Sequence, residues 1–168
     1  MKKCSIKIAL LSVFLLSISC STMRYNINKN NRFTEKQIIN LLQKNGNVFY
    51  LSSTYATFST VWTYNINGIE IYRLAKGKVN QKETFSEKEL IQYEGVVFED
   101  IEKELYQKCA LELDGDMFGF RIDIDGKIHK EDYAVNINCL KKGTYKSDFL
   151  NKLVNDIKAY NMWEINYQ

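Results

Sequence analysis

Alternating side-chain character between Ala56 and Ile66 is the clearest local pattern in the chain. Apolar, aromatic or β-branched residues occupy every second position there. The positions between them are polar, except for Val61. A period of two places such side chains on one face of a β-strand. Asn67-Gly68 follows, a dipeptide that favours a tight turn. The pattern predicts a β-hairpin with a return strand over 69–74 and a neighbouring strand over 48–52.

A second alternating stretch surrounds Asp125-Gly126, another dipeptide typical of tight turns. Before this turn, every second residue from Phe118 to Ile124 is large and apolar. After it, apolar residues again fall on one face of a segment from Lys127 to about Cys139. This segment therefore predicts a second β-hairpin.

Two capping motifs, 52 residues apart, predict the starts of helices. Thr34 would cap the first helix, and Gln37 would close a capping box. The same device returns at Ser86 and Glu89, where a short helix over about 87–93 is expected. Each motif precedes one predicted hairpin, so the chain could contain two related α-β-β units. Common capping chemistry without duplication is the alternative.

Two longer amphipathic helices complete the expected elements. Apolar residues spaced by three or four positions predict one helix over about 98–108 and another over about 147–160, with Trp163 following the second. Antiparallel β-hairpins packed with helices define an α+β fold. We therefore predict a single α+β domain over 33–168.

The first 19 residues have a different composition from the rest of the chain. Lys2, Lys3 and Lys7 flank an apolar run over 8–18 that only two serines interrupt. A membrane-spanning helix needs about 20 apolar residues, so this run is too short to be one. Its length and basic flank are typical of a secretory signal peptide, which we assign to 1–19.

The sequence Leu16-Ser17-Ile18-Ser19-Cys20 resembles a lipobox, the cleavage site of bacterial lipoproteins. The resemblance implies cleavage before Cys20, diacylation of its thiol and, often, acylation of the new amino group. Two or three acyl chains hold a protein firmly on a membrane. The polar segment 20–32 would then be a lipidated tether. We expect a protein anchored in the bacterial cell envelope, with the outer membrane favoured over the inner; ordinary secretion and an uncleaved anchor are the alternatives.

Charge balance argues against a nucleic-acid partner. Removal of 1–19 from the 168-residue chain leaves 149 residues, enough for one domain. Three of the 23 Lys and Arg residues lie in the signal peptide, so 20 basic residues face 20 acidic ones in the mature chain. Such a chain has no electrostatic footprint for nucleic acid. The segment 83–104 carries eight carboxylates against two lysines, which predicts either solvated helix faces or a patch for a basic partner.

Groups suited to catalysis are sparse, and we predict no catalytic residue. His129 is the only histidine, which excludes a metal site with two His ligands, and we expect no metal or cofactor. A Cys–His pair of His129 and Cys139 would need both side chains on one face of the second return strand. Four acids near the second turn could provide a carboxylate pair for glycoside hydrolysis, but acids at turns are usually solvated. They are Asp114, Asp116, Asp123 and Asp125.

Cys109 and Cys139 are the only thiols of the mature chain besides Cys20. An oxidising envelope favours a disulfide between them, and closure of a loop of about 30 residues would stabilise the fold by about 3–4 kcal/mol. Both cysteines also lie on predicted apolar faces, where buried free thiols are common. A disulfide and two free thiols therefore both remain open.

The segment from Met117 onward resembles the C-terminal domain of TonB in the order of its elements. A strand ending Ile122-Asp123-Ile124-Asp125-Gly126-Lys127-Ile128 precedes a second strand, a helix over 150–160 and then Trp163. The resemblance covers about 50 residues and implies a periplasmic αβ binding module. The chain lacks a proline-rich spacer, so energy transduction is not implied.

The sequence favours a non-enzymatic envelope lipoprotein whose domain binds a protein partner, as an assembly factor or as an inhibitor or immunity protein. A small envelope hydrolase with carboxylates near Asp125-Gly126 is one alternative. A glycan-binding or peptide-binding domain is another, in which Trp62, Tyr64 and Tyr72 would form an aromatic platform.

Overall fold

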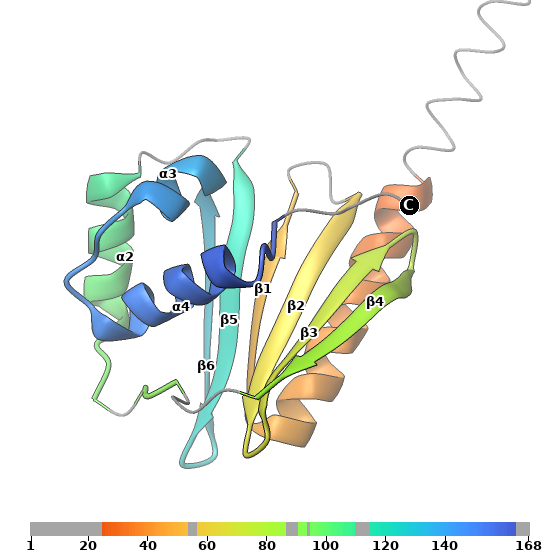
Figure 1. The fold of residues 1–168 in the computed structure, drawn as a ribbon, viewed down its shortest axis with the longest axis horizontal. Coiled ribbons are helices and arrows are strands. Elements are labelled where there is room, and N and C mark those ends of the chain that lie inside the picture. Colours follow the sequence, from red (N-terminus) through yellow and green to blue (C-terminus); the bar gives the residue numbers. More distant parts are fainter. Residues whose placement is uncertain (1–24, 54–56, 87–90, 94, 110–114, 164–168) are drawn as a thin grey trace, which may run out of the picture.

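The computed structural model describes residues 25–53, 57–86, 91–93, 95–109 and 115–163, and within these ranges the chain has an α+β fold (Figure 1). A helix over residues 25–45, called here the N-terminal helix, precedes the first strand. The strands are β1 (Asn47–Ser52), β2 (Phe58–Asn65), β3 (Gly68–Ala75), β4 (Lys78–Phe85), β5 (Asp116–Ile124) and β6 (Lys127–Val135). The other helices are α2 (Phe98–Lys108), α3 (Ile137–Lys142) and α4 (Asp148–Ala159).

The six strands form one antiparallel sheet in the order β4-β3-β2-β1-β5-β6. Both predicted hairpins are present, and β1 lies between them as the neighbour of β2 and β5. The second turn is Asp125-Gly126, as expected, and both residues have the positive φ of a tight hairpin turn. The first turn instead consists of Ile66-Asn67, because Asn65 pairs with Gly68.

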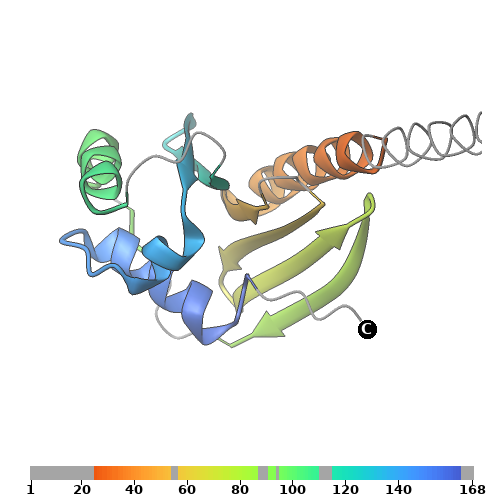
Figure 2. The ribbon, with the colours of Figure 1, turned by 90° about the horizontal axis from the view of Figure 1, so that it is seen from above.

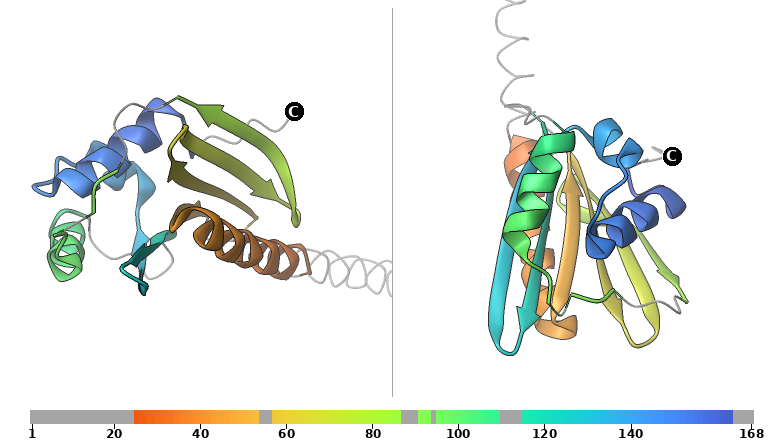
Figure 3. Two further views of the ribbon diagram at one scale, coloured as in Figure 1. Left: turned by 90° about the horizontal axis from the view of Figure 1, so that it is seen from below. Right: turned by 90° about the vertical axis from the view of Figure 1, so that its left-hand side faces the viewer.

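Apolar side chains cover both faces of the central strands. One face carries Phe49, Trp62 and Phe120, and it packs against α2, α3 and α4 in the larger hydrophobic core. The opposite face packs against the N-terminal helix through a smaller core that includes Tyr50 and Val61. Figures 2 and 3 show the N-terminal helix on one side of the sheet and α4 on the other. Burial on both faces explains why β1 and β2 are almost entirely buried.

The N-terminal helix extends through residues 25–32, which were predicted to form part of the polar tether. The predicted helix start at Thr34 is wrong, because the residues before and after Thr34 are helical. Its hydroxyl does not cap the helix but donates to Ser59 Oγ (3.3 Å). Asn30 is completely buried, and its side-chain oxygen accepts from the Gly77 amide (3.4 Å). Packing on the β3–β4 turn therefore stabilises a segment whose asparagines have low helix propensity.

In the last third of the chain, the predicted helices are present but the predicted last strand is shorter than expected. Helices over 98–108 and about 147–160 are confirmed, and the Ser147 hydroxyl accepts from the Leu150 amide at the start of α4. The strand expected to reach Cys139 ends at Val135. Asn136 caps α3 instead, because its side-chain oxygen accepts from two amides of the first helical turn.

The second capping motif falls in a region with a different structure. Phe85 is the last residue of β4, a strand that the sequence pattern does not predict. The expected helix over 87–93 lies mostly outside the described residues, and 91–93 are not helical. The N-terminal helix precedes four strands, whereas α2 precedes two, so the two halves differ in their order of elements.

Candidate binding surfaces

His129 and Cys139 do not form a catalytic pair. His129 lies near the start of β6, opposite Ile122, and its ring packs on Phe98 with 4.8 Å between ring centroids. Cys139 lies on α3, beyond the far end of the same strand. Six residues of strand between His129 and Val135 span about 20 Å. The condition for such a pair, both side chains on one face of this strand, is not met, because β6 ends at Val135, before Cys139.

Cys109 and Cys139 are joined in a disulfide, with an Sγ–Sγ distance of 2.14 Å and a Cα–Cα distance of 5.7 Å. Cys109 is the C-cap of α2 and Cys139 lies in α3, so the bond fixes the end of one helix to the other. Neither thiol is then available as a nucleophile. Cys20, the predicted lipidation site, lies outside the described residues.

The candidate carboxylates are not gathered around one cleft. Asp116 begins β5, and Asp123 lies seven residues further along this strand, a separation of about 23 Å. Asp123 Oδ1 accepts from the Gly126 amide (2.8 Å), which makes it part of the turn. Asp125 is exposed in that turn, and Asp114 lies outside the described residues. Among the described residues, no group of three or more His, Cys, Asp or Glu side chains could hold a metal ion.

The three aromatic residues near the first hairpin are buried and form no exposed platform. Trp62 is inaccessible to solvent, and Tyr64 and Tyr72 are 3% and 8% exposed. The Tyr64 hydroxyl donates to Asp156 of α4. The Tyr72 hydroxyl donates to Glu70 (2.6 Å). These contacts assign the three side chains to packing between layers.

A groove of about 690 Å³ lies between α2 and the start of α4. Ile101 and Phe149 contribute its buried apolar surface, while Val96 and Val97 line the approach to α2. Val97 is 53% exposed and is the most accessible of these apolar side chains. Charged residues surround this apolar strip. The lining residues of the charged rim are Asp100, Lys103, Glu104, Lys108, Lys146 and Asp148.

Glu104 holds the two walls of the groove together. Its carboxylate accepts hydrogen bonds from the backbone amides of Lys146 and Ser147, immediately before α4, the second at 3.2 Å. The amides at a helix start lack partners within the helix, so an acceptor from another element satisfies them. Lys108, one turn along α2, lies 3.6 Å from the same carboxylate. The relative position of α2 and α4 is therefore fixed by specific polar contacts.

A patch for a basic partner was the alternative to solvated helix faces for the carboxylates of 83–104, and three of these carboxylates make specific contacts. Glu83 pairs with Arg73 (3.4 Å), and Asp100 pairs with Lys103 (3.3 Å). Glu104 bridges α2 and α4 as described above. The carboxylates at 87, 89 and 94 lie outside the described residues. Within the described residues, this stretch does not form one continuous surface of unpaired acids.

A smaller hollow of about 300 Å³ lies beside the N-terminal helix, over β1 and β5. Next to it, the buried Arg121 guanidinium donates to Tyr50 Oη (2.7 Å) and to Asp132 Oδ1 (2.8 Å). Gly119 leaves room for this network, because a Cβ there would contact the Tyr50 phenol oxygen and lie 2.7 Å from Asp132 Oδ1. Burial lowers the pKa of Arg121 from its ordinary value, and nearby Glu35 and Glu131 partly oppose this effect. The donors of Arg121 are used within the protein, which makes the network structural.

Comparisons with protein-family models, with curated proteins and with solved structures give no match for this chain. The likeness to the TonB C-terminal domain therefore rests on the sequence pattern alone. Within the part of the chain that the structure describes, no helix has the length and apolar character needed to cross a membrane.

Proposed function

We propose that this chain is a lipid-anchored protein of the bacterial envelope whose domain binds another protein through the groove between α2 and α4. The observation that carries the proposal is the groove itself, an open hollow in which the exposed Val97 side chain lies among charged residues. Interfaces between proteins have this arrangement, with apolar residues at the centre and polar residues around them. The anchor is inferred from the lipobox pattern that ends at Cys20.

The form of the groove favours a protein segment over a small molecule. Small-molecule sites bury most of the ligand surface in a concave pocket. This groove is open and lies between two helices, so an extended segment or a helix of a partner could lie along it. Contact with a partner would bury the exposed apolar surface of Val97, and removal of this surface from water favours binding.

The anchor is tested by intact mass and membrane partitioning of the wild type beside Cys20→Ala. Acylation of the cysteine predicts added acyl mass and membrane association in the wild type, and neither in the variant. Soluble, unacylated protein in both cases would contradict the lipobox assignment.

The groove is tested by site-specific photo-crosslinking in the native envelope. A photoreactive residue at position 97 should give a discrete crosslinked protein, whereas the same residue at position 66 should not. Ile66 is a suitable control, because it is 93% exposed in the β2–β3 turn and does not line the groove. Identical products at positions 97 and 66, or none at position 97, would refute the groove as the binding surface.

A further inference from the structure

Charged side chains differ between the two ends of the sheet. The β3–β4 turn, the end of β1 and the start of β5 lie at one end, because Ala75 pairs with Phe58 and Ser52 pairs with both Ser59 and Met117. The β5–β6 turn and the start of α2 lie at the other end, where Phe98 packs on His129. The first end carries lysines from two parts of the chain, and the second carries several exposed acids. The exposed acids are Glu99, Asp100, Asp123 and Asp125.

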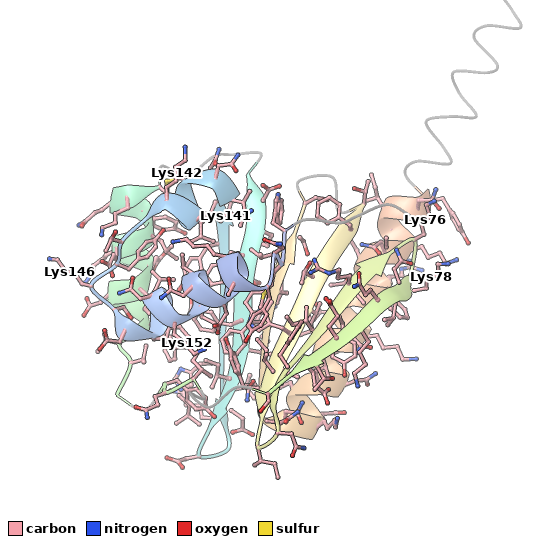
Figure 4. All side chains as sticks on the ribbon, in the orientation of Figure 1. Lys76, Lys78, Lys141, Lys142, Lys146 and Lys152 are labelled. Carbon is pink, nitrogen blue, oxygen red and sulfur yellow. A yellow bond between two sulfur atoms is a disulfide. The ribbon has the colours of Figure 1, made fainter. Side chains whose placement is uncertain are left out.

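Contacts across the β3–β4 turn bring the first lysines together. Lys76 and Lys78 flank Gly77 in this turn, which has positive φ at both Lys76 and Gly77. The aliphatic part of Lys29 lies directly over Gly77, so closely that a Cβ there would be 2.7 Å from Lys29 Cγ. Three ammonium groups from two segments that are about 50 residues apart therefore share one small area. Figure 4 shows Lys76 and Lys78 at the end of the sheet where the N-terminal helix begins.

The N-terminal helix extends this cationic area along one flank. Lys29, Arg32 and Lys36 are spaced by three and four residues, which places them on one side of a helix, and all three are exposed. Glu35, three residues after Arg32, borders this row, and its charge also influences Arg121 and Asp132. We call the surface formed by Lys29, Arg32, Lys36, Lys76 and Lys78 the basic end. Within the described residues, none of these five cations forms an ion pair.

The basic end also lies close to the proposed anchor. Four residues lie between Cys20 and Tyr25, the first described residue of the N-terminal helix, and the five extended chain steps between the two reach at most about 18 Å. A lipid on Cys20 would therefore keep the membrane surface near the start of this helix. Anionic lipids attract basic segments that come within about a Debye length, about 8 Å at physiological salt.

We propose that the basic end lies against the anionic lipid headgroups of the membrane that holds Cys20, so that the domain has a fixed orientation on the bilayer. The proposal rests on the lipid anchor of the proposed function. It gives a reason for five cations that have no carboxylate partner among the described residues, at the anchored end of a mature chain whose total charge is balanced. In this orientation the hairpin at Asp125-Gly126 points away from the membrane, since it occupies the opposite end of the sheet.

The test measures how fast individual lysines react with an amine reagent when the acylated full chain is incorporated in lipid vesicles. Vesicles with about 30% anionic phosphatidylglycerol are compared with neutral phosphatidylcholine vesicles. We expect Lys29, Lys76 and Lys78 to react at least about threefold more slowly on the anionic vesicles, and the difference to disappear near 1 M salt, where the Debye length falls to about 3 Å. Lys127, at the opposite end, should react at the same rate on both.

Charge-reversal variants make the test specific. Lys76→Glu combined with Lys78→Glu should abolish the protection of Lys29, whereas Lys127→Glu combined with Lys130→Glu should leave it unchanged. All four side chains are exposed, so neither variant disturbs the core. Equal reaction rates on the two kinds of vesicle, or equal protection of Lys127, would overturn the proposal.

The intact mass of the same sample separates the two possible failures. Acyl mass together with unprotected lysines would refute the orientation and leave the anchor in place. A chain without acyl mass would refute the anchor and, with it, the orientation that depends on it.

Discussion

Replacement of Asp156 by alanine should destabilise the fold by about 3–5 kcal/mol, the usual effect of breaking a buried ion pair from one side. Asp156 is 4% exposed and pairs with Lys152, with Nζ–Oδ distances of 2.8 and 2.9 Å. It also accepts a hydrogen bond from the Tyr64 hydroxyl across the interface between α4 and the sheet. The alanine variant would leave Lys152, whose side chain is only 19% exposed, without this carboxylate.

A second Asp–Lys pair in the same protein provides the matched control. Asp100 and Lys103 lie on α2, 3.3 Å apart, and their side chains are 70% and 69% exposed. Exposed pairs contribute only about 0.2–1 kcal/mol, because water solvates the separated charges well. Asp100→Ala should therefore lower the free energy of unfolding by less than about 1 kcal/mol.

Urea unfolding at pH 7, followed by circular dichroism, measures both changes. The double variant Lys152→Met with Asp156→Leu should recover part of the lost stability, because apolar residues of similar volume can replace a buried ion pair, although the Tyr64 hydroxyl still loses its acceptor. The reasoning would be refuted if Asp156→Ala and Asp100→Ala had equal effects. It would also be refuted if the double variant were less stable than Asp156→Ala.

Three further predictions concern covalent, steric and pH effects. Replacing Cys109 and Cys139 by alanine opens a link between residues 30 positions apart and should lower stability in urea by about 3–4 kcal/mol, and a reductant should affect only the wild type. Gly119→Ala should cost about 1–3 kcal/mol in thermal or urea unfolding, since the new Cβ collides with the phenol and carboxylate above it, and a neutral result would contradict the crowding. Hydrogen bonding from Tyr72, together with nearby lysines, holds the pKa of Glu70 below its ordinary value of 4.5. The stability that Glu70 contributes is therefore present above pH 4.5 and lost as pH falls through the lower folded-state pKa. The difference in free energy of unfolding between wild type and Glu70→Gln should shrink under acid conditions. A difference that stays constant with pH would refute this linkage.

The strands and helices with strong periodicity could be predicted because burial on one side determines their side-chain pattern. In β5, Phe118, Phe120 and Ile122 are completely buried on the face toward the helices. In α4, Leu150, Leu153 and Ile157 form the buried stripe at helical spacing. The spacing of the apolar residues identifies each of these elements as a strand or a helix, because another backbone conformation would expose those side chains to water.

Strand β4 was not predicted, because it is an edge strand without the buried residues that produce an alternating pattern. Seven of its positions lack apolar contacts with the core, and its pairing with β3 supplies most of its structure. The turn before it did have a local signal. Lys76-Gly77 is a two-residue link whose glycine adopts positive φ, as a tight hairpin turn requires. Recognition of that glycine as a turn residue would have extended the first hairpin to a third strand.

The groove could not be predicted from local patterns, because its walls come from distant parts of the chain. Val97 and Phe149 are separated by about 50 residues; Val97 precedes α2 and Phe149 lies in the apolar stripe of α4. Their proximity depends on Glu104 reaching the amides before α4. A glutamate on a helix surface has no sequence feature that distinguishes such a role from simple solvation.

The attachment of helix α2 to the domain depends on a bond that is stable in the compartment that the lipobox implies. Only Phe98, Ile101 and Leu105 of this helix are buried, so its apolar contact with the domain is narrow. Two specific links supplement that contact, the disulfide at its C-terminal end and the Glu104 hydrogen bonds in its second half. A disulfide persists in an oxidising envelope and is reduced in a bacterial cytosol. The groove would therefore have its fixed shape in the compartment where an anchored partner-binding domain would operate, which makes the proposed location and the proposed surface mutually consistent.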